Sequence, residues 1–205
     1  MGLKFFYYNE EKLYTISKFL EIVCARAGAK MKKERIVLGG GCFWCIEAVY
    51  RNVKGVLSAV SAYSGGARAN PTYENICSGA TGHAEVVDIS YDAQSITLSE
   101  ILDIFFVIHD PTTLNQQGAD KGTQYRSVIY YENEEQKRVI EASIAKHQAD
   151  FSDPIVTEVS PLGEVYTAES YHQNYYNLNS SQGYCQVVIA PKLQKFMQHF
   201  PEKLC

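Results

Sequence analysis

Hydrophobic residues recur along the chain with two different spacings, which predict both strands and helices. Strands are predicted by short apolar or alternating runs at residues 34–38, 56–63, 85–91 and 126–131. Helices are predicted by apolar residues three to four positions apart in residues 42–53, 97–105 and 133–144. The mixture predicts a protein of α and β elements around one core.

Two of the predicted helices begin with recognisable capping signals. Thr97 is followed three residues later by Glu100, which is the pattern of a capping box. Asn133 is followed in the same way by Gln136, and Pro154 rules out a long continuation of that helix. These signals place the starts of both helices.

The order of the predicted elements is strand, helix, two strands, helix, strand. This is the split β-α-β order of a ferredoxin-like two-layer sandwich, which belongs to the α+β class. The extended loops between the elements carry glycine and polar residues, so we expect them to hold the functional site. Near the end of the chain, residues 186–192 predict an ordered strand and a short helix instead of a mobile tail.

A single catalytic domain is expected over residues 34–205, after an N-terminal extension over residues 1–33. A chain of 205 residues with 46% hydrophobic content can bury one core. Charged residues interrupt the apolar stretches of the first 30 residues, so no secretion signal is predicted. Met31 stands just before the first predicted strand, and the residues ahead of it are expected to be an appendage or a misassigned upstream start.

Charge and cysteine usage exclude several classes of function. A net charge of −4 provides no broad basic surface for nucleic acid, and no apolar stretch is long enough to span a membrane. The six cysteines are too unevenly spaced for a disulfide scaffold, which favours redox or catalytic use. No second closely spaced Cys/His pair supports a zinc site. We expect a soluble, cytoplasmic, monomeric enzyme without metal or cofactor.

Candidate chemistry concentrates in the segment Gly39-Gly40-Gly41-Cys42-Phe43-Trp44-Cys45. The glycines allow a sharp turn, after which Cys42 stands at the start of a predicted helix beside the only tryptophan of the chain. Free N–H groups and the dipole at a helix N-terminus favour an anion, so we expect the pKa of Cys42 to fall from about 8.5 to between about 3.5 and 7.5. The segment predicts a thiolate nucleophile in an aromatic pocket.

Glu85 is the candidate acid. In an extended strand it shares one face with Val87, Ile89 and Tyr91, so burial is expected to raise its pKa. A carboxylic acid that stays protonated near neutrality can donate a proton. A glutamate at the exposed start of a strand, paired with a lysine or arginine, explains the pattern equally well.

Several short motifs occur together and in a consistent order. They are Gly41-Cys42-Phe43-Trp44, Asn70-Pro71-Thr72-Tyr73, Gly82-His83-Ala84-Glu85, His109-Asp110-Pro111-Thr112, Gly122-Thr123-Gln124-Tyr125-Arg126-Ser127 and His172-Gln173-Asn174-Tyr175. With these motifs the chain resembles the peptide methionine sulfoxide reductase A family from about Arg35 to Pro191. The resemblance implies reduction of methionine S-sulfoxide, free or in proteins, as a repair of oxidative damage, with thioredoxin as the reductant.

The resemblance also implies roles for the two reacting groups and for two phenols. Cys42 would attack the sulfoxide sulfur while Glu85 supplies a proton to the oxygen. Tyr73 and Tyr125 would hydrogen-bond that oxygen without adding a buried charge. Taken singly, two tyrosines are also typical of the caps at sheet edges.

Three further matches concern substrate binding. Phe43 and Trp44 would form the aromatic wall that receives the S-methyl group of the substrate, although an aromatic pair after a glycine turn is also typical of a core. Asp120 would lie near the substrate backbone and position it. His83 matches no chemical step of the family, and we interpret it as a structural residue that holds a loop.

A second thiol must condense with the sulfenic acid that the reaction leaves on Cys42. Cys185, in Gly183-Tyr184-Cys185, matches the resolving cysteine of family members and is the first choice. Cys45 is its rival, because it forms a Cys-x-x-Cys pair with Cys42 at a helix start. Cys205 at the chain terminus could also reach the site.

Competing functions remain open at this point. A thioredoxin-like dithiol oxidoreductase built on Cys42-x-x-Cys45 would explain the cysteine pair but not Tyr73, Glu85 or Tyr125. A metal-binding or redox-sensing module would use the histidines, and a Cys-His hydrolase would pair Cys42 with His172. Nothing in the sequence indicates an acyl substrate for the hydrolase.

Overall fold

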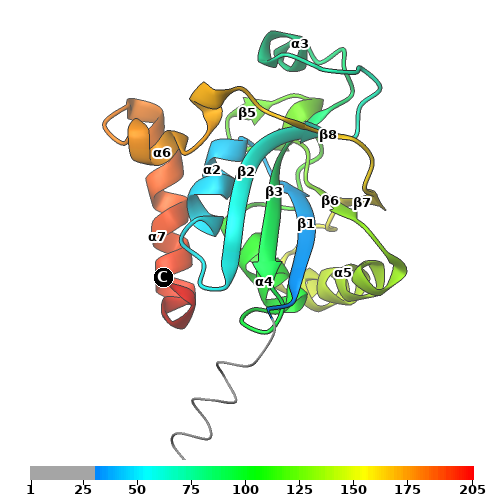
Figure 1. Ribbon diagram of the computed structural model, residues 1–205, viewed down its shortest axis with the longest axis vertical. Helices are drawn as coiled ribbons and strands as arrows, with labels where there is room; N and C mark the ends of the chain where they lie inside the picture. The colour runs from blue at the N-terminus through cyan, green and yellow to red at the C-terminus, as the bar shows by residue number, and fades with distance from the viewer. Residues whose placement is uncertain (1–30) are drawn as a thin grey trace, which may run out of the picture. The chain divides into compact units, whose positions relative to one another are not determined.

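A six-stranded sheet in the order β7-β6-β1-β3-β2-β8 organises the computed structural model, which describes residues 31–205 (Figure 1). Its four central strands pair antiparallel and are β1 (Lys33–Gly39), β2 (Val56–Ser64), β3 (Ala84–Asp92) and β6 (Val128–Tyr131). At the edges, β7 (Glu158–Pro161) runs parallel to β6 and β8 (Val165–Thr167) antiparallel to β2. The expectations for the N-terminal extension fall almost entirely outside the described residues.

The strands and helices predicted between residues 34 and 144 are present, and the expected mixture of α and β elements is confirmed. The helices of the predicted segments are α2 (Phe43–Tyr50), α4 (Leu98–Ile108) and α5 (Glu134–His147). Shorter elements add α3 (Tyr73–Cys77), α6 (Tyr175–Leu178) and the two-residue strands β4 (Gln116–Gln117) and β5 (Asp120–Lys121). The edge strands escaped prediction because three or four residues are too few to show a period, and Pro161 is tolerated there since it needs no ladder N–H.

The capping signals are confirmed by the hydrogen bonds at both helix starts. The Thr97 hydroxyl accepts from the Glu100 N–H, and the Glu100 carboxylate accepts from the Thr97 N–H at 2.8 Å. The Asn133 side chain accepts from the Gln136 N–H at 2.9 Å. Each bond satisfies a donor that the first turn of a helix leaves free.

The strand expected after Cys185 is wrong. Residues Cys185–Ile189 form a π-helix that continues directly into α7 (Ala190–His199). Cys185 and Ile189, four positions apart, are buried whereas Val187 is 75% exposed, so the apolar run Val187-Val188-Ile189 follows a helical period. Pro191 fits because the first turn of a helix needs no N–H at that position.

The helices cover one face of the sheet, and a small second cluster lies on the other. Ile36, Val87 and Ile89 face the larger core with α2, α4, α5 and α7, while Val37 and Val86 point to the opposite side. Figure 1 shows α7 beside α2 and α5 beside α4 on that helical layer. Within residues 31–205, no helix is long and apolar enough to cross a bilayer.

The end of the chain is fastened to the turn that follows α2. Leu204 forms an antiparallel bridge with Val53, and the Cys205 N–H donates to the Asn52 carbonyl at 3.1 Å. The Lys54 N–H donates to the Lys203 carbonyl at 2.7 Å. These bonds hold Cys205 beside residues 52–54.

Thr97→Ala removes the acceptor of the α4 capping box. We expect the free energy of unfolding to fall by about 1 kcal/mol, which urea denaturation followed by circular dichroism measures. Thr97→Ser keeps the hydroxyl and is expected to retain most of that stability. Equal losses in both variants would show that the lost methyl group, and not the cap, accounts for the effect.

Candidate active site

A glycine turn between β1 and α2 carries Cys42 onto the helical face of the sheet. Gly41 has φ +90°, and a Cβ there would lie 2.6 Å from the Gln117 side chain. A Cβ on Gly40 would lie 3.1 Å from the ring of His109. The Gln117 and His109 side chains therefore leave no room for larger residues in this turn, and only glycine fits at Gly41.

Cys42 is the N-cap residue of α2, as predicted, but its thiol does not benefit from the helix terminus. Its side chain makes no capping hydrogen bond, and the Phe43 N–H donates instead to Oε2 of Glu85 at 3.1 Å. Burial raises the pKa of Cys42 well above its usual value, and the adjoining Cys45 thiol and Glu85 raise it further. The predicted fall of this pKa is therefore wrong for the resting protein.

The two thiols of the Cys-x-x-Cys pair interact directly. A hydrogen bond from Cys42 lowers the pKa of Cys45 despite burial, and the positive charge of Lys192 acts in the same direction. Of the two thiols, Cys45 is therefore the one that ionises more readily.

Glu85 is the buried acid that its strand pattern predicted. Its side chain is 1% exposed, and burial raises its pKa to about 8 against the single lowering contact with the Phe43 N–H. Within the described part of the chain, Glu85 has no salt bridge to a lysine or arginine, so the exposed ion pair considered above is not formed. The carboxyl is protonated at neutral pH.

Two phenols face this carboxyl from different loops. Tyr73 begins α3, and Tyr125 ends the 3₁₀ turn Thr123–Tyr125. Burial raises the pKa of each hydroxyl, and the charge that Glu85 acquires when it ionises raises it further. Both phenols consequently remain protonated and available as hydrogen-bond donors.

An aromatic wall adjoins Cys42. Phe43 is buried and Trp44 half-buried, with their ring centroids 6.2 Å apart. Trp44 stacks on Tyr175 at 3.6 Å between centroids, and Tyr184 approaches its edge at 5.9 Å. The last two residues were not predicted, although both lie in motifs already singled out, His172-Gln173-Asn174-Tyr175 and Gly183-Tyr184-Cys185.

Asp120 is tied to this wall through Tyr184. The Tyr184 hydroxyl donates to Oδ2 of Asp120 at 2.8 Å, and burial, together with Cys42, raises the pKa of that hydroxyl. The short pair β4 and β5 holds Asp120, which is half-buried. The structure thus brings the predicted positioning carboxylate to the nucleophile.

The five cysteines of residues 31–205 are free thiols. Cys185 is buried, which raises its pKa, and the Cys45 thiol raises this pKa further. Cys77 and Cys205 are exposed, and Cys205 is held beside Asn52 as described above. Cys185 therefore lies near the second cysteine of the pair.

The histidines of the motifs have structural partners. His83 accepts from the Gly66 N–H at 3.0 Å and contacts the Arg68 carbonyl at 2.8 Å, which supports its interpretation as a loop-holding residue. Burial lowers the pKa of His109 to about 3. Its ring nitrogens form hydrogen bonds with the Phe105 carbonyl and the Ser127 hydroxyl. Among residues 31–205, no three His, Cys, Asp or Glu side chains gather as a metal site.

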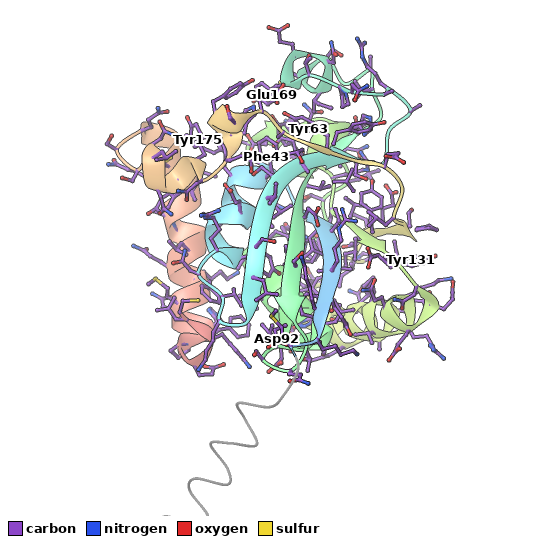
Figure 2. The ribbon with its side chains drawn as sticks, in the orientation of Figure 1. Phe43, Tyr63, Asp92, Tyr131, Glu169 and Tyr175 are labelled. Atoms are coloured by element: carbon purple, nitrogen blue, oxygen red, sulfur yellow. The ribbon has the colours of Figure 1, made fainter. Side chains whose placement is uncertain are left out.

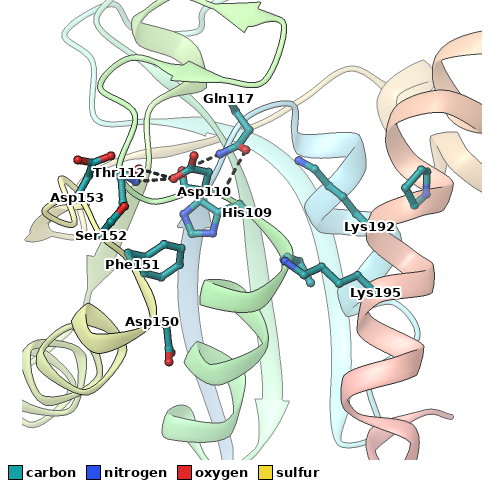
Figure 3. Close-up of a pocket in the computed structure, with 12 residues that line it drawn as sticks. His109, Asp110, Thr112, Gln117, Asp150, Phe151, Ser152, Asp153, Lys192 and Lys195 are labelled. Carbon is teal, nitrogen blue, oxygen red and sulfur yellow. Dashed lines mark hydrogen bonds between the residues drawn. The ribbon is translucent and has the colours of Figure 1, made fainter.

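A cavity of about 580 Å³ lies behind the glycine turn (Figure 3). His109 and Gln117, the residues that close the turn, form part of its wall, and Lys192 and Lys195 project toward it from α7. None of the predicted site residues lines this cavity. It is separate from the cluster around Cys42.

Comparison with known proteins identifies close relatives. A family model described as peptide methionine sulfoxide reductase matches residues 34–204. The chain is 53% identical over 169 residues to peptide methionine sulfoxide reductase MsrA of Polynucleobacter asymbioticus, covering 82% of this chain and 89% of the relative. It is 57% identical over 171 residues to the MsrA protein of Nitratiruptor sp., covering 83% and 98%.

Solved structures agree with these relatives. Reduced Mxr1 from Saccharomyces cerevisiae superposes with a TM-score of 0.70 at 35% identity, covering 75% of this chain and 90% of that one. Methionine sulfoxide reductase A of Corynebacterium diphtheriae superposes with a TM-score of 0.67 at 34% identity, covering 75% and 78%. The fold and the sequence therefore point to the same family.

The raised pKa of Glu85 predicts an infrared band that changes with pH. The C=O stretch of a protonated carboxylic acid should be present at pH 7 and disappear with a midpoint near pH 8, because Glu85 ionises as the pH rises through its pKa. Glu85→Gln should remove this band from the difference spectrum.

Glu47 supplies the matched control, since burial also raises the pKa of this carboxyl. Glu47→Gln should leave the band with a midpoint near pH 8 in place. If Glu85→Gln leaves the pH 7 band unchanged, Glu85 is ionised and the assignment is wrong.

Proposed function

The chain belongs to the peptide methionine sulfoxide reductase family, and from that membership we propose that the cluster around Cys42 is its active site. The protein is an oxidoreductase that reduces methionine sulfoxide to methionine at the expense of thiols. The single observation that carries the proposed site is Glu85, a buried and protonated carboxyl bonded to the residue next to Cys42. Such a group supplies the proton that loss of a sulfoxide oxygen requires.

The reaction begins with attack of Cys42 sulfur on the sulfoxide sulfur. Glu85 gives its proton to the sulfoxide oxygen as the S–S bond between Cys42 and the substrate forms, and the thiol proton of Cys42 passes to Glu85. The hydroxyl then moves from the substrate sulfur to Cys42 sulfur as the S–S bond breaks, which releases methionine and leaves a sulfenic acid. The substrate is reduced by two electrons, and the thiol is oxidised by two.

Neutral donors assist this step. We assign Tyr73 and Tyr125 to hydrogen bonds with the sulfoxide oxygen, because both phenols stay protonated beside Glu85. Phe43 and Trp44 receive the S-methyl group in an apolar wall, where sulfur-aromatic contacts favour the thioether product. Asp120, oriented by Tyr184, positions the substrate backbone.

The sulfenic acid is resolved by a second thiol, for which we propose Cys185 with Cys45 as competitor. The motif Gly183-Tyr184-Cys185 supports Cys185, and its place in a π-helix supports local unwinding, since this geometry is rare and concentrates at functional sites. Direct interaction with Cys42 supports Cys45. Either reaction joins two sulfurs and releases water.

We further propose that residues 34–205 are the catalytic domain, a monomer of the cytoplasm with a ferredoxin-like core. The succession β1-α2-β2-β3-α4-β6 and the central order β6-β1-β3-β2 support that description of the core. Methionine S-sulfoxide, free or in proteins, is the substrate. Thioredoxin as reductant rests on the resemblance to the family.

Cys42→Ser tests the proposed nucleophile. With methionine S-sulfoxide and dithiothreitol, the wild type should release methionine, measured by chromatography, and the variant should fall to the uncatalysed rate. Cys77→Ser is the matched control, because Cys77 is an exposed free thiol, and it should keep most of the activity. Sustained turnover by Cys42→Ser would disprove the assignment.

Disulfide mapping after one turnover tests the resolving thiol. We expect a peptide that joins Cys42 to Cys185 in the wild type, and accumulation of the sulfenic acid in Cys185→Ser. Mass spectrometry after trapping of sulfenic acid distinguishes the two states. A bond between Cys42 and Cys45 that forms at the same rate in Cys185→Ser would assign resolution to Cys45.

A further inference from the structure

His172 contacts the indole of Trp44 in one defined protonation state. The Trp44 Nε1–H donates to Nδ1 of His172 at 3.1 Å. Because an indole nitrogen can only donate, Nδ1 must be unprotonated, and the neutral ring carries its proton on Nε2. Burial lowers the pKa of His172, which keeps the ring in this neutral form.

The other ring nitrogen points toward a carboxylate. His172 is 1% exposed, its Nε2 has no hydrogen-bond partner among the described residues, and Oε2 of Glu169 lies 3.9 Å away. Despite the opposing effect of burial, hydrogen bonds with Tyr73 and Tyr63 lower the pKa of Glu169, which is therefore ionised. The carboxylate favours the tautomer that the Trp44 bond requires.

Glu169 also holds two elements of the site. Its Oε1 accepts from the Tyr73 N–H at 2.8 Å, and its Oε2 accepts from the Tyr63 hydroxyl at 2.8 Å. Figure 2 shows Glu169, Tyr63 and Phe43 gathered at one end of the sheet, near β2 and α2. A single carboxylate thus ties the start of α3 to β2.

The ring of His172 packs directly against the proposed substrate residues. Its centroid lies 5.0 Å from that of Phe43 and 4.4 Å from that of Tyr73. The ring is 1% exposed and packed between residues to which we assign the substrate. Any effect on the reaction must pass through its neighbours.

The backbone that carries His172 is held from two sides. The amide of Gln173 accepts from the Ser61 N–H at 3.1 Å and donates to the Ser61 carbonyl at 2.9 Å. The Asn174 N–H donates to Oε1 of the buried Glu47 at 2.7 Å. The segment is therefore fixed on β2 and on α2, and the ring has a rigid base.

We propose that His172, together with Glu169, is a positioning residue that holds the indole of Trp44 and the start of α3 in place before substrate binds. The inference rests on the proposed function of Trp44 and Tyr73. Removing the acceptor leaves the indole N–H unpaired, so the ring loses its fixed orientation while Cys42 and Glu85 are untouched.

His172→Phe and His172→Asn form the decisive pair of variants. Phenylalanine offers no acceptor, whereas the Asn Oδ1 can replace Nδ1. We expect kcat/KM to fall about 5- to 30-fold in His172→Phe, chiefly through KM, and to recover in His172→Asn. Equal losses in the two variants would overturn the proposal.

The single tryptophan of the chain provides a readout that does not depend on turnover. Its indole ¹H–¹⁵N signal should shift to lower proton frequency in His172→Phe and stay near the wild-type position in His172→Asn. An unchanged signal in His172→Phe would refute the hydrogen bond. A wild type without sulfoxide reductase activity would instead contradict the proposed function and leave this test intact.

His147 is the matched control, because it is also buried and hydrogen-bonded but contacts Asp103 and Asp150 instead of the site. His147→Asn should leave both the indole signal and KM unchanged. If His172→Phe does not fold, the ¹⁵N signals of His172 in the wild type show which ring nitrogen carries the proton, and we expect it on Nε2. A proton on Nδ1 would overturn the proposal.

Discussion

The hydrogen bond from the Phe43 N–H to Glu85 is the interaction on which the site depends. It joins the first turn of α2 to the start of β3. A free N–H group at the N-terminus of α2 thus bonds the Glu85 carboxyl and not the Cys42 thiol. The cost of burying Glu85 is met by protonation, so no opposing charge is needed. Cys42 then remains a thiol at rest, and its reactivity is linked to the proton that Glu85 holds.

The reactive groups of the site are buried or half-buried in their neutral forms, and in the proposed reaction they are activated only when the substrate binds. Cys42 and Glu85 are buried, Tyr73 and Tyr125 are half-buried, and each is held in its neutral form. A neutral cluster can be buried among aromatic rings without an ion partner. In the proposed reaction, charge develops among these four groups when a polar sulfoxide enters, and the hydroxyls that bond its oxygen are already in place.

Local patterns predicted the parts of the fold that depend on neighbours in sequence. The strands around Val37, Ala59, Ile89 and Ile129 followed from periodicity, and the start of α4 followed from its capping box. The burial of Glu85 followed in the same way from the alternation of its strand. The pKa of Cys42 was predicted wrongly because burial, the largest of its causes, raises it, and burial depends on packing across the chain that local pattern does not reveal. The roles of Tyr184 and His172 likewise arise from contacts across the chain.

The C-terminal segment is fixed at both of its ends, with Tyr184 bound to Asp120 and Leu204 paired with Val53. When both ends of a segment are held, a residue between them can move far only if the helix that contains it unwinds locally. The π-helix over Cys185–Ile189 stores more residues per turn than an α-helix does. Unwinding of this turn would lengthen the segment at Cys185 itself, the thiol that we propose for resolution.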